Sequence, residues 1–242
     1  MLVGARVVVV VPAFREAPRL GRVLASMPTF VDDIIVVDDA SDDDTAAIAG
    51  ACADLDARIT CISHAINRGV GAAIVTGYRR ALGPRGKAND AFAVMAGDGQ
   101  MDPRDLAAVV SPIVRGDAGY VKGNRYRSAD RAAIPFFRRA GGEALSLMTS
   151  IAIGRKIRDS QCGFTAIARE TCASLDLSAI FPRFGYPNDM LGELAIRKWK
   201  IVEVDVRAIY ADEESKLRAW HVPKIAGIIA RAGVRRARQA LF

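Results

Sequence analysis

The sequence predicts a single α/β domain built on a mainly parallel central sheet. Three observations support this fold class: short apolar runs rich in β-branched residues, helical patterns between them, and regular alternation of the two. An uninterrupted apolar run is typical of a strand that is covered on both faces, as strands of parallel sheets are. Alternation over the first hundred residues indicates βαβ units, with helices on both faces of the sheet.

The first strand is expected at residues 7–11, which read VVVVV and end at Pro12. The next strands are expected at 34–37, 59–63 and 92–96. Helical patterns between them span about 18–27, 42–54 and 70–82. Ser41 and Asp44 form a capping-box pattern, which predicts where the second of these helices begins.

The second half of the chain continues with a helix whose two ends are clearly signalled. Asp102 is a good N-cap, Pro103 suits the first helical turn, and Gly116 ends the pattern. After it we expect a strand at 120–123, a helix at 136–153, a loop at 160–164, a helix at 188–198 and a strand at 201–209. We therefore expect one domain over residues 1–214.

Residues 215–242 form a basic extension of this domain. The chain has 34 Lys and Arg against 27 Asp and Glu, and this segment holds seven basic residues and no acidic one, so the whole excess of +7 lies in it. The asymmetry indicates an anionic partner, either a membrane surface or nucleic acid. A partly amphipathic helix over 224–242 either lies on an anionic membrane or packs on the domain.

The sequence predicts a cytoplasmic protein. The longest stretch without a charge is 144–154, about half of the ~20 apolar residues that a membrane-spanning helix needs. The N-terminus has no signal-peptide pattern, and the four cysteines show no CxxC pairing. The basic extension is compatible with peripheral contact at the inner face of the membrane.

Acidic residues follow several strands, at the sheet edge where α/β proteins bind ligands. Pro12 and Glu16 follow the first strand, Asp38 and Asp39 end the second, and Asp98 follows the fourth between two glycines. Crowded carboxylates are unfavourable unless a cation or hydrogen-bond donors are present. Mg²⁺ bound through one or two carboxylates and substrate phosphates fits this arrangement.

A glycine-rich stretch, NRGVGAAI at 67–74, half-matches the dinucleotide-binding fingerprint, because Ile74 stands where the third glycine would be. It leaves open a loop around Gly71 whose backbone amides meet phosphate. The sequence has no Walker A motif and no G-x-S-x-G motif, which argues against P-loop ATPases and Ser-His-Asp hydrolases.

Six segments occur in an order and spacing that resemble family 2 glycosyltransferases with the GT-A fold. They are VVVVVPAFREAPRL, VVDDASDDDT, NRGVGAA, MAGDGQMDP, GNRY and DSQCGF. The resemblance covers about residues 5–215 and is greatest to the dolichyl- or polyprenyl-phosphate mannosyl- and glucosyltransferase branch. It implies inverting transfer of a sugar from a UDP- or GDP-linked donor to a polyprenyl phosphate, with Mg²⁺ or Mn²⁺.

On the donor side, the resemblance implies that Pro12 and Glu16 line the nucleoside pocket, and that Asp38 reads the base with Asp39 beside it. Asp98 matches the metal-binding Asp of the family's D-x-D motif, and Gln100 matches a further polar residue of the metal site. Ala96 occupies the place of the first Asp in that motif. The metal would then depend on Asp98, Gln100, water and diphosphate oxygens.

On the acceptor side, Arg125 and Arg138 match two arginines that hold the acceptor phosphate in this branch, while Ser160 and Phe164 would shape the acceptor loop. Guanidinium groups suit phosphate because they offer paired donors and stay charged. Asp189 stands where relatives that glycosylate a hydroxyl place a general base. It therefore separates a phosphate acceptor from a hydroxyl of a glycan or small metabolite.

Two further hypotheses place the protein outside the enzymes, as a binding protein. A nucleotide-sugar-binding protein without catalysis would explain Ala96 in the metal motif. Nucleic-acid binding through the extension lacks interleaved aromatic residues and any known nucleic-acid-binding motif, so no nucleic-acid partner is expected.

Overall fold

The computed structural model describes residues 2, 4–84, 86–127, 134–209 and 222–239. Its elements alternate between strand and helix, as the sequence pattern predicts. The first half contains β1 (Val7–Ala13), α1 (Ala17–Ala25), β2 (Asp33–Asp38), α2 (Thr45–Leu55), β3 (Ile59–Ser63), α3 (Val70–Leu82) and β4 (Ala91–Val94). The second half contains η1 (Pro103–Asp105), α4 (Leu106–Val114), β5 (Tyr120–Asn124), α5 (Phe136–Ile153), β6 (Thr165–Ala168), α6 (Arg169–Ser174), α7 (Tyr186–Ile196), β7 (Ile201–Asp205) and α8 (Val222–Gln239).

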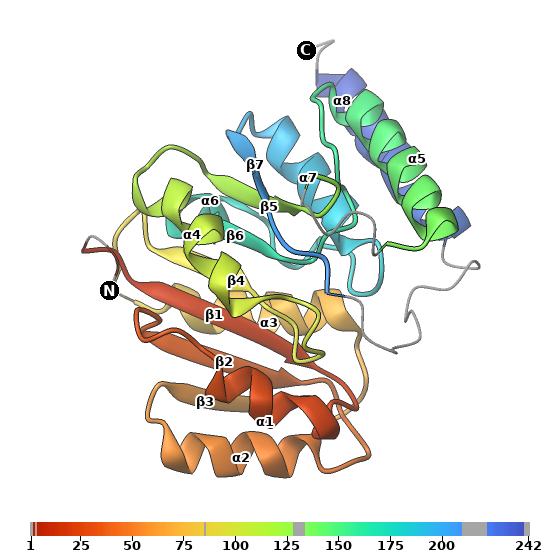
Figure 1. Cartoon of the computed structure of the whole chain (residues 1–242). Coiled ribbons are helices and arrows are strands. Elements are labelled where there is room, and N and C mark those ends of the chain that lie inside the picture. Colours follow the sequence, from red (N-terminus) through yellow and green to blue (C-terminus); the bar gives the residue numbers. More distant parts are fainter. Residues whose placement is uncertain (1, 3, 85, 128–133, 210–221, 240–242) are drawn as a thin grey trace.

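Within the described residues, the strands form one seven-stranded sheet in the order β3-β2-β1-β4-β6-β5-β7 (Figure 1). β6 is antiparallel to both of its neighbours, and the other pairs are parallel. The sequence pattern predicts neither β6 nor α6, because both are short and β6 passes directly into α6 without the turn residues that mark the ends of other elements. The expected mainly parallel sheet is confirmed.

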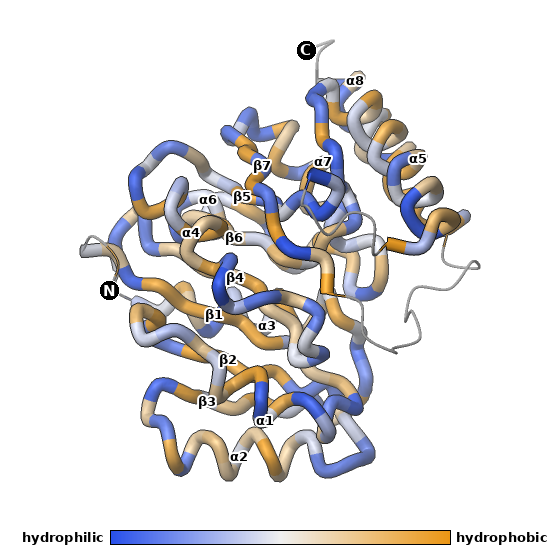
Figure 2. The backbone as a smooth tube through the Cα atoms, viewed as in Figure 1, coloured by the Kyte–Doolittle hydropathy of each residue, from blue (hydrophilic) through white to orange (hydrophobic). Residues whose placement is uncertain are grey.

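The sheet is covered by helices on both faces, which explains the uninterrupted apolar runs. Val7, Val9 and Val11 pack on the side of α1 and α4, whereas Val8 and Val10 pack on the side of α3. All five valines of this run are fully buried. Figure 2 shows the apolar chain segments concentrated in these central strands.

The two helices α5 and α8 lie side by side beyond the β7 end of the sheet (Figure 1). α8 packs against α5 and α7, and Ile225 and Ile229 form a buried cluster with Leu145 of α5. The apolar side of the basic extension is thus buried within the protein. Residues 215–221 and 240–242 of the extension lie outside the described residues. In the described part, no helix is long and apolar enough to span a membrane.

One predicted helix start is wrong. α2 begins at Thr45 after Asp44, and the Ser41 hydroxyl donates to Asp38 instead of capping the helix. The Asp43 carboxylate accepts from the Thr45 backbone N–H. The start of the α4 region agrees with prediction, because Asp102 accepts a hydrogen bond from the backbone N–H of Arg104.

Candidate active site

A cavity of about 1110 Å³ opens at the carboxyl ends of the central strands. Its wall includes Pro12 at the end of β1, Asp39 after β2, Asp98 after β4 and Arg125 after β5. Parallel strands end at the same sheet edge, so the residues that follow them meet there although the sequence separates them. Helices α5 and α7 close the cavity on the side away from β1.

Most of the predicted site residues meet on this cavity. Its lining includes Pro12, Glu16, Asp39, Asp98, Gln100, Arg125, Arg138 and Phe164. Four other predicted residues, Asp38, Gly71, Ser160 and Asp189, are described by the structure but do not belong to the lining. Each of the four is buried and has a packing or hydrogen-bonding role nearby.

Asp38 and Asp39 have different surroundings although they are adjacent. The Asp38 carboxylate accepts from the backbone N–H and hydroxyl of Ser41. The Asp39 carboxylate accepts from the backbone N–H groups of Arg68 at 2.9 Å and Gly69 at 2.7 Å, and it also contacts His64. Successive side chains along an extended chain point to opposite sides, so only one of the two lies on the cavity wall. That residue is Asp39.

The glycine-rich stretch serves close packing. A Cβ atom at Gly71 would collide with the carbonyl oxygen of Phe181, and one at Gly69 would lie 2.6 Å from the carbonyl oxygen of Pro182. Gly69 also has φ +99°, which favours glycine. The backbone N–H of Ala72 donates to Pro182 at 2.9 Å. Here the glycines hold the start of α3 against the segment before α7.

The metal-site candidates lie on the loop after β4. Asp98 is half-buried, and its carboxylate accepts from the backbone N–H of Gln100 at 3.1 Å. Among the described residues, no group of three or more His, Cys, Asp or Glu side chains is placed to hold a metal ion. Mg²⁺ commonly binds through one or two carboxylates and substrate phosphates. The donor set of Asp98 and Gln100 fits an ion whose coordination the donor diphosphate completes.

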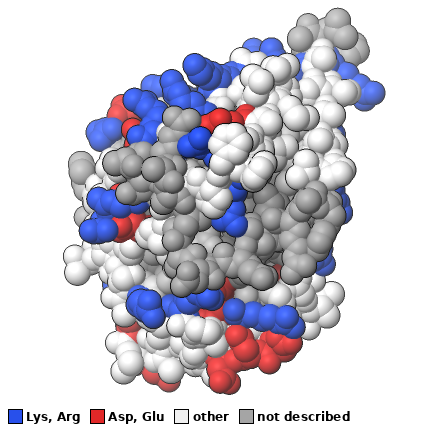
Figure 3. Space-filling model, turned by 45° about the vertical axis from the view of Figure 1, so that its right-hand side comes forward, with Lys and Arg blue, Asp and Glu red and all other residues white. Residues whose placement is uncertain are grey.

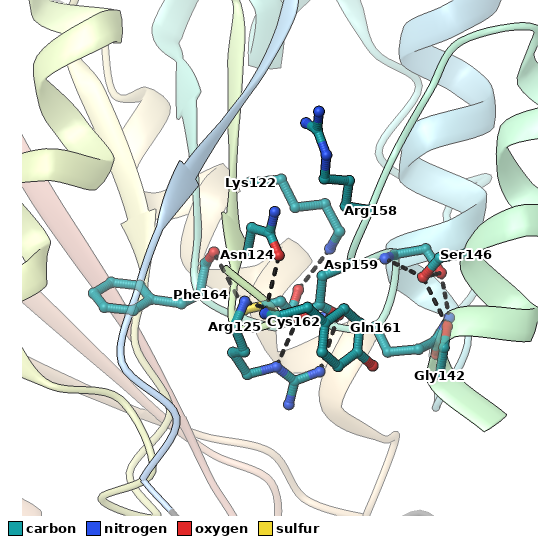
Figure 4. Close-up of polar contacts among 12 residues, drawn as sticks. Lys122, Asn124, Arg125, Gly142, Ser146, Arg158, Asp159, Gln161, Cys162 and Phe164 are labelled. Carbon is teal, nitrogen blue, oxygen red and sulfur yellow. Dashed lines mark hydrogen bonds and ion pairs between the residues drawn. The ribbon is translucent and has the colours of Figure 1, made fainter. Parts of the chain in front are cut away.

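Arg125 is positioned by a buried carboxylate that sequence reasoning missed. Its Nε and a terminal guanidinium nitrogen donate to the two carboxylate oxygens of Asp159 at 2.8 and 3.0 Å (Figure 4). Asp159 is fully buried. Burial disfavours its charged form, but the charge and hydrogen bonds of Arg125 outweigh that effect and lower the pKa of Asp159. Asp159 directly precedes SQCGF, and that adjacency is the one sequence signal for it.

A buried lysine, Lys122, lies beside the Arg125–Asp159 pair. Lys122 is fully buried, and its Nζ donates to the backbone carbonyl of Cys162 at 2.6 Å (Figure 4). Burial lowers the pKa of Lys122. The backbone N–H of Cys162 donates to Asp159. Lys122 and Asp159 thus hold the 159–164 loop against the end of β5. Arg125 is the first residue after that strand.

The acceptor-side candidates surround the same part of the cavity. Arg138 lies in the first turn of α5, and Phe164 forms part of the wall with 1% of its surface exposed. Ser160 is fully buried, and its backbone N–H donates to the Ser146 hydroxyl of α5 at 2.9 Å. Ser160 therefore anchors the loop under α5, while Phe164 and the two arginines line the cavity.

Asp189 lies in the first turn of α7 with 2% of its surface exposed. One carboxylate oxygen accepts from the backbone N–H of Phe181 at 2.8 Å, and the other accepts from Arg231 of α8 at 2.6 Å. A second pair of this kind joins Glu193 of α7 to Arg235 of α8. In this structure Asp189 holds α8 and the 181–187 segment together, and it does not itself line the cavity.

Comparison with known proteins agrees with this geometry. The family model described as "Glycosyl transferase family 2" matches residues 8–171. The chain is 27% identical over 219 residues to the UDP-N-acetylglucosamine–dolichyl-phosphate N-acetylglucosaminyltransferase of Methanococcus voltae, covering 84% of this chain and 85% of the relative. It is 28% identical over 235 residues to the undecaprenyl-phosphate mannosyltransferase of Micrococcus luteus, covering 95% of this chain and 94% of the relative.

The fold is similar to that of solved glycosyltransferase structures. Glucosyl-3-phosphoglycerate synthase from Mycobacterium tuberculosis, solved with Mn²⁺, UDP and glucosyl-3-phosphoglycerate, superposes with a TM-score of 0.69 at 18% identity. The match covers 96% of this chain and 80% of that protein, and at this identity it shows the shared GT-A fold. Together with the family match, it shows that the chain is an enzyme and belongs to glycosyl transferase family 2.

Proposed function

We propose that this glycosyltransferase moves a sugar from a UDP- or GDP-linked donor to a polyprenyl phosphate, with inversion at the sugar carbon and with Mg²⁺ or Mn²⁺. The observation that carries the proposal is the pair of arginines, Arg125 and Arg138, on the wall of the cavity that also holds Asp98. The names of the Methanococcus and Micrococcus relatives, which describe transfer to dolichyl and undecaprenyl phosphate, support the same acceptor.

The donor would bind with its nucleoside against Pro12, Glu16 and Asp39 and its diphosphate near Asp98. We retain Asp38 only as a residue that shapes this wall, because Ser41 already occupies its carboxylate. Asp98 and Gln100 would hold the metal ion. When bound, such an ion neutralises charge on the departing diphosphate.

The acceptor phosphate would bind between Arg125 and Arg138, which keep it oriented toward the sugar. A phosphate monoester has a second pKa of about 6, so at neutral pH it is already largely ionised. One of its oxygens attacks the anomeric carbon from the face opposite the diphosphate. The new carbon–oxygen bond forms as the bond to the nucleoside diphosphate breaks, and no proton needs to be removed.

The surroundings of Asp189 support a phosphate acceptor over a hydroxyl. A hydroxyl acceptor needs a carboxylate within hydrogen-bond distance of its proton. Both oxygens of Asp189 are engaged by Phe181 and Arg231, and the residue does not line the cavity. The hydroxyl-transfer alternative would require Asp189 to leave both partners.

A transfer assay tests the proposal. Purified protein is incubated with labelled UDP- or GDP-sugars, Mn²⁺ and undecaprenyl phosphate, and labelled lipid is extracted into organic solvent. We expect product with undecaprenyl phosphate and none with undecaprenol, which has the same chain but no phosphate. Equal product with undecaprenol, or no lipid product with any donor, would contradict the proposal.

Variants separate the metal site from general damage. Asp98→Asn should reduce turnover by about 10²–10³-fold, because the ion would lose its one carboxylate ligand. Asp117→Asn is the matched control, since Asp117 is exposed and pairs with Arg115 at the far end of α4. Its activity should equal that of the wild type.

A further inference from the structure

One apolar side of helix α5 is not covered by any other described part of the chain. The other side is accounted for, because Leu145 packs against Ile225 and Ile229 of α8. The uncovered side, here called the α5 face, consists of Phe136, Phe137, Ala144, Leu147, Met148 and Ile151. Phe137 is 88% exposed, Ile151 71% and Leu147 63%. Their spacing of three, four and seven residues places them along one stripe of the helix.

An exposed stripe of large apolar side chains on a folded domain indicates a surface that binds something. Leu55 and Ile66 are also exposed, but each lies alone. Phe137 and Met148 belong both to the α5 face and to the wall of the cavity. The apolar surface therefore continues from the outside of α5 into the candidate acceptor site.

Basic residues border the α5 face. They are Arg139 in the first turn of α5, Arg155 and Lys156 just after its C-terminal end, and Arg236 of α8, against one exposed acidic residue of α5, Glu143. The Arg236 guanidinium donates to the backbone carbonyls of Ile151 and Ala152, which places a cation at the C-terminal end of the stripe. Figure 3 shows a white surface at the upper right, where α5 and α8 come forward, with Lys and Arg atoms at its edges.

We propose that the α5 face docks on the surface of an anionic lipid bilayer, with its apolar side chains at the boundary of headgroups and acyl chains. Apolar side chains flanked by cations suit such a surface, because burial of apolar area adds to attraction by anionic headgroups. The inference rests on the proposed function, because a polyprenyl phosphate is itself a membrane lipid. Docking on α5 brings the cavity mouth to that membrane.

This location differs from the membrane contact expected for the basic extension. The apolar side of α8 formed by Ile225, Ile228 and Ile229 is buried against α5 and α7, so these side chains are not available to a membrane. In our proposal α8 contributes a cation, Arg236, and α5 contributes the apolar contact.

Sedimentation with vesicles tests the proposal without any acceptor present. The full-length protein is mixed with phosphatidylcholine vesicles, with or without phosphatidylglycerol, and with no polyprenyl phosphate. We expect binding to rise with phosphatidylglycerol and to fall with added salt. Leu147→Ser/Ile151→Ser should weaken binding by about tenfold or more, since two large apolar contacts are lost.

The matched control is Leu55→Ser, because Leu55 is 90% exposed on α2, at the far side of the molecule from α5 (Figure 1). Its vesicle binding should equal that of the wild type. Insertion is tested with Leu147→Trp, whose fluorescence should shift to shorter wavelength with anionic vesicles and be quenched by brominated lipid. Leu55→Trp should show neither effect.

Three results would overturn the proposal: no binding of the wild type to anionic vesicles, equal binding by the double variant, or a dimer that requires Leu147 and Ile151 while the protein stays off vesicles. Failure of the proposed function would be seen separately. Neither Leu147 nor Ile151 lines the cavity, so transfer to a short, water-soluble prenyl phosphate should be unchanged in the double variant. Absence of that transfer in the wild type would contradict the function and leave the vesicle result standing.

Discussion

At the residue scale, Arg125 of the candidate site is held in place by a buried carboxylate. Arg125 has a carboxylate partner in Asp159, which is fully buried, and Lys122 of β5 lies buried beside the same loop. A buried charge is tolerated only when it is paired and hydrogen-bonded. We infer that Asp159 is a positioning residue, which orients Arg125 toward the cavity.

Asp159→Asn should destabilise the protein by about 3–5 kcal/mol, because it leaves the buried Lys122 and the partly buried Arg125 without their counter-charge. The lowered pKa of Asp159 gives this loss a pH dependence. The contribution of Asp159 is complete above its unfolded-state pKa of about 4 and disappears as the pH falls through the lower folded-state pKa. Urea denaturation between pH 3 and 7 should show the two proteins converging in acid.

Asp159→Asn should also raise the KM for the phosphate acceptor by a larger factor than it lowers kcat.

The control for stability is Asp117→Asn, which removes an exposed ion pair and should change the free energy of unfolding by at most about 0.5 kcal/mol. A loss of less than about 1 kcal/mol in Asp159→Asn at pH 7 would contradict the positioning role.

Asp189→Asn should distinguish a structural role of Asp189 from a role as a catalytic base. The amide oxygen can still accept from Phe181, but the charge that pairs with Arg231 is lost, so we expect a stability loss of about 1–3 kcal/mol. Transfer to undecaprenyl phosphate should stay within about tenfold of the wild type. A fall of about 10³-fold or more, measured as initial rates on folded protein, would identify Asp189 as a base.

At the element scale, α8 is part of the folded domain. Ile225 and Ile229 are buried against α5, and Arg231 and Arg235 pair with acidic residues of α7. Basic residues that look like a membrane-binding run in the sequence thus partly serve to hold the helix in place. The cavity wall includes residues of α5, of the start of α7 and, from the first turn of α8, Val222 and Lys224, so α8 both holds the neighbouring helices and contributes to the wall.

Ile225→Ala should lower the free energy of unfolding by about 2–5 kcal/mol, because Ile225 is fully buried between helices. The matched control is Val234→Ala on the same helix, where the side chain is 52% exposed and the loss should be about 0.5 kcal/mol or less. Equal stability of Ile225→Ala and the wild type in urea would show that α8 is not packed as described.

At the scale of the whole molecule, the sheet edge brings together residues from four separate strand ends. Pro12, Asp39, Asp98 and Arg125 are spread over more than a hundred positions but line one cavity. Its large volume leaves room for a donor, an ion and an acceptor phosphate together. Donor and metal binding should therefore depend on each other.

Thermal unfolding with added ligands measures this dependence. We expect UDP- or GDP-sugars to raise Tm by roughly 5–10 °C at about a hundred times Kd, and to do so strongly only when Mn²⁺ or Mg²⁺ is present. EDTA should abolish the metal-dependent part of the shift, and Asp98→Asn should not show it. A full shift in EDTA would count against the metal.

The sequence alone predicted the strands and α-helices other than β6 and α6, and with them the strand ends that carry the site. The strand at 59–63 and the helices at 70–82 and 136–153 have the bounds that the pattern predicts. Apolar periodicity, glycine and proline are local sequence signals of helices, strands and turns. An uninterrupted run of valines predicts a strand that is buried on both faces. The positions of Asp98 and Arg125 follow from the same pattern, because Asp98 lies in the loop after β4 and Arg125 directly follows β5.

Only the tertiary structure decided that Asp39, and not the adjacent Asp38, faces the cavity, and which surfaces α8 covers. The Arg125–Asp159 pair spans 34 positions and the Asp189–Arg231 pair spans 42. Gly71 is needed because a carbonyl of residue 181 approaches it, and β6 forms because two distant strands flank it. Such contacts depend on how the elements pack in space, and residue spacing along the chain carries no signal for that.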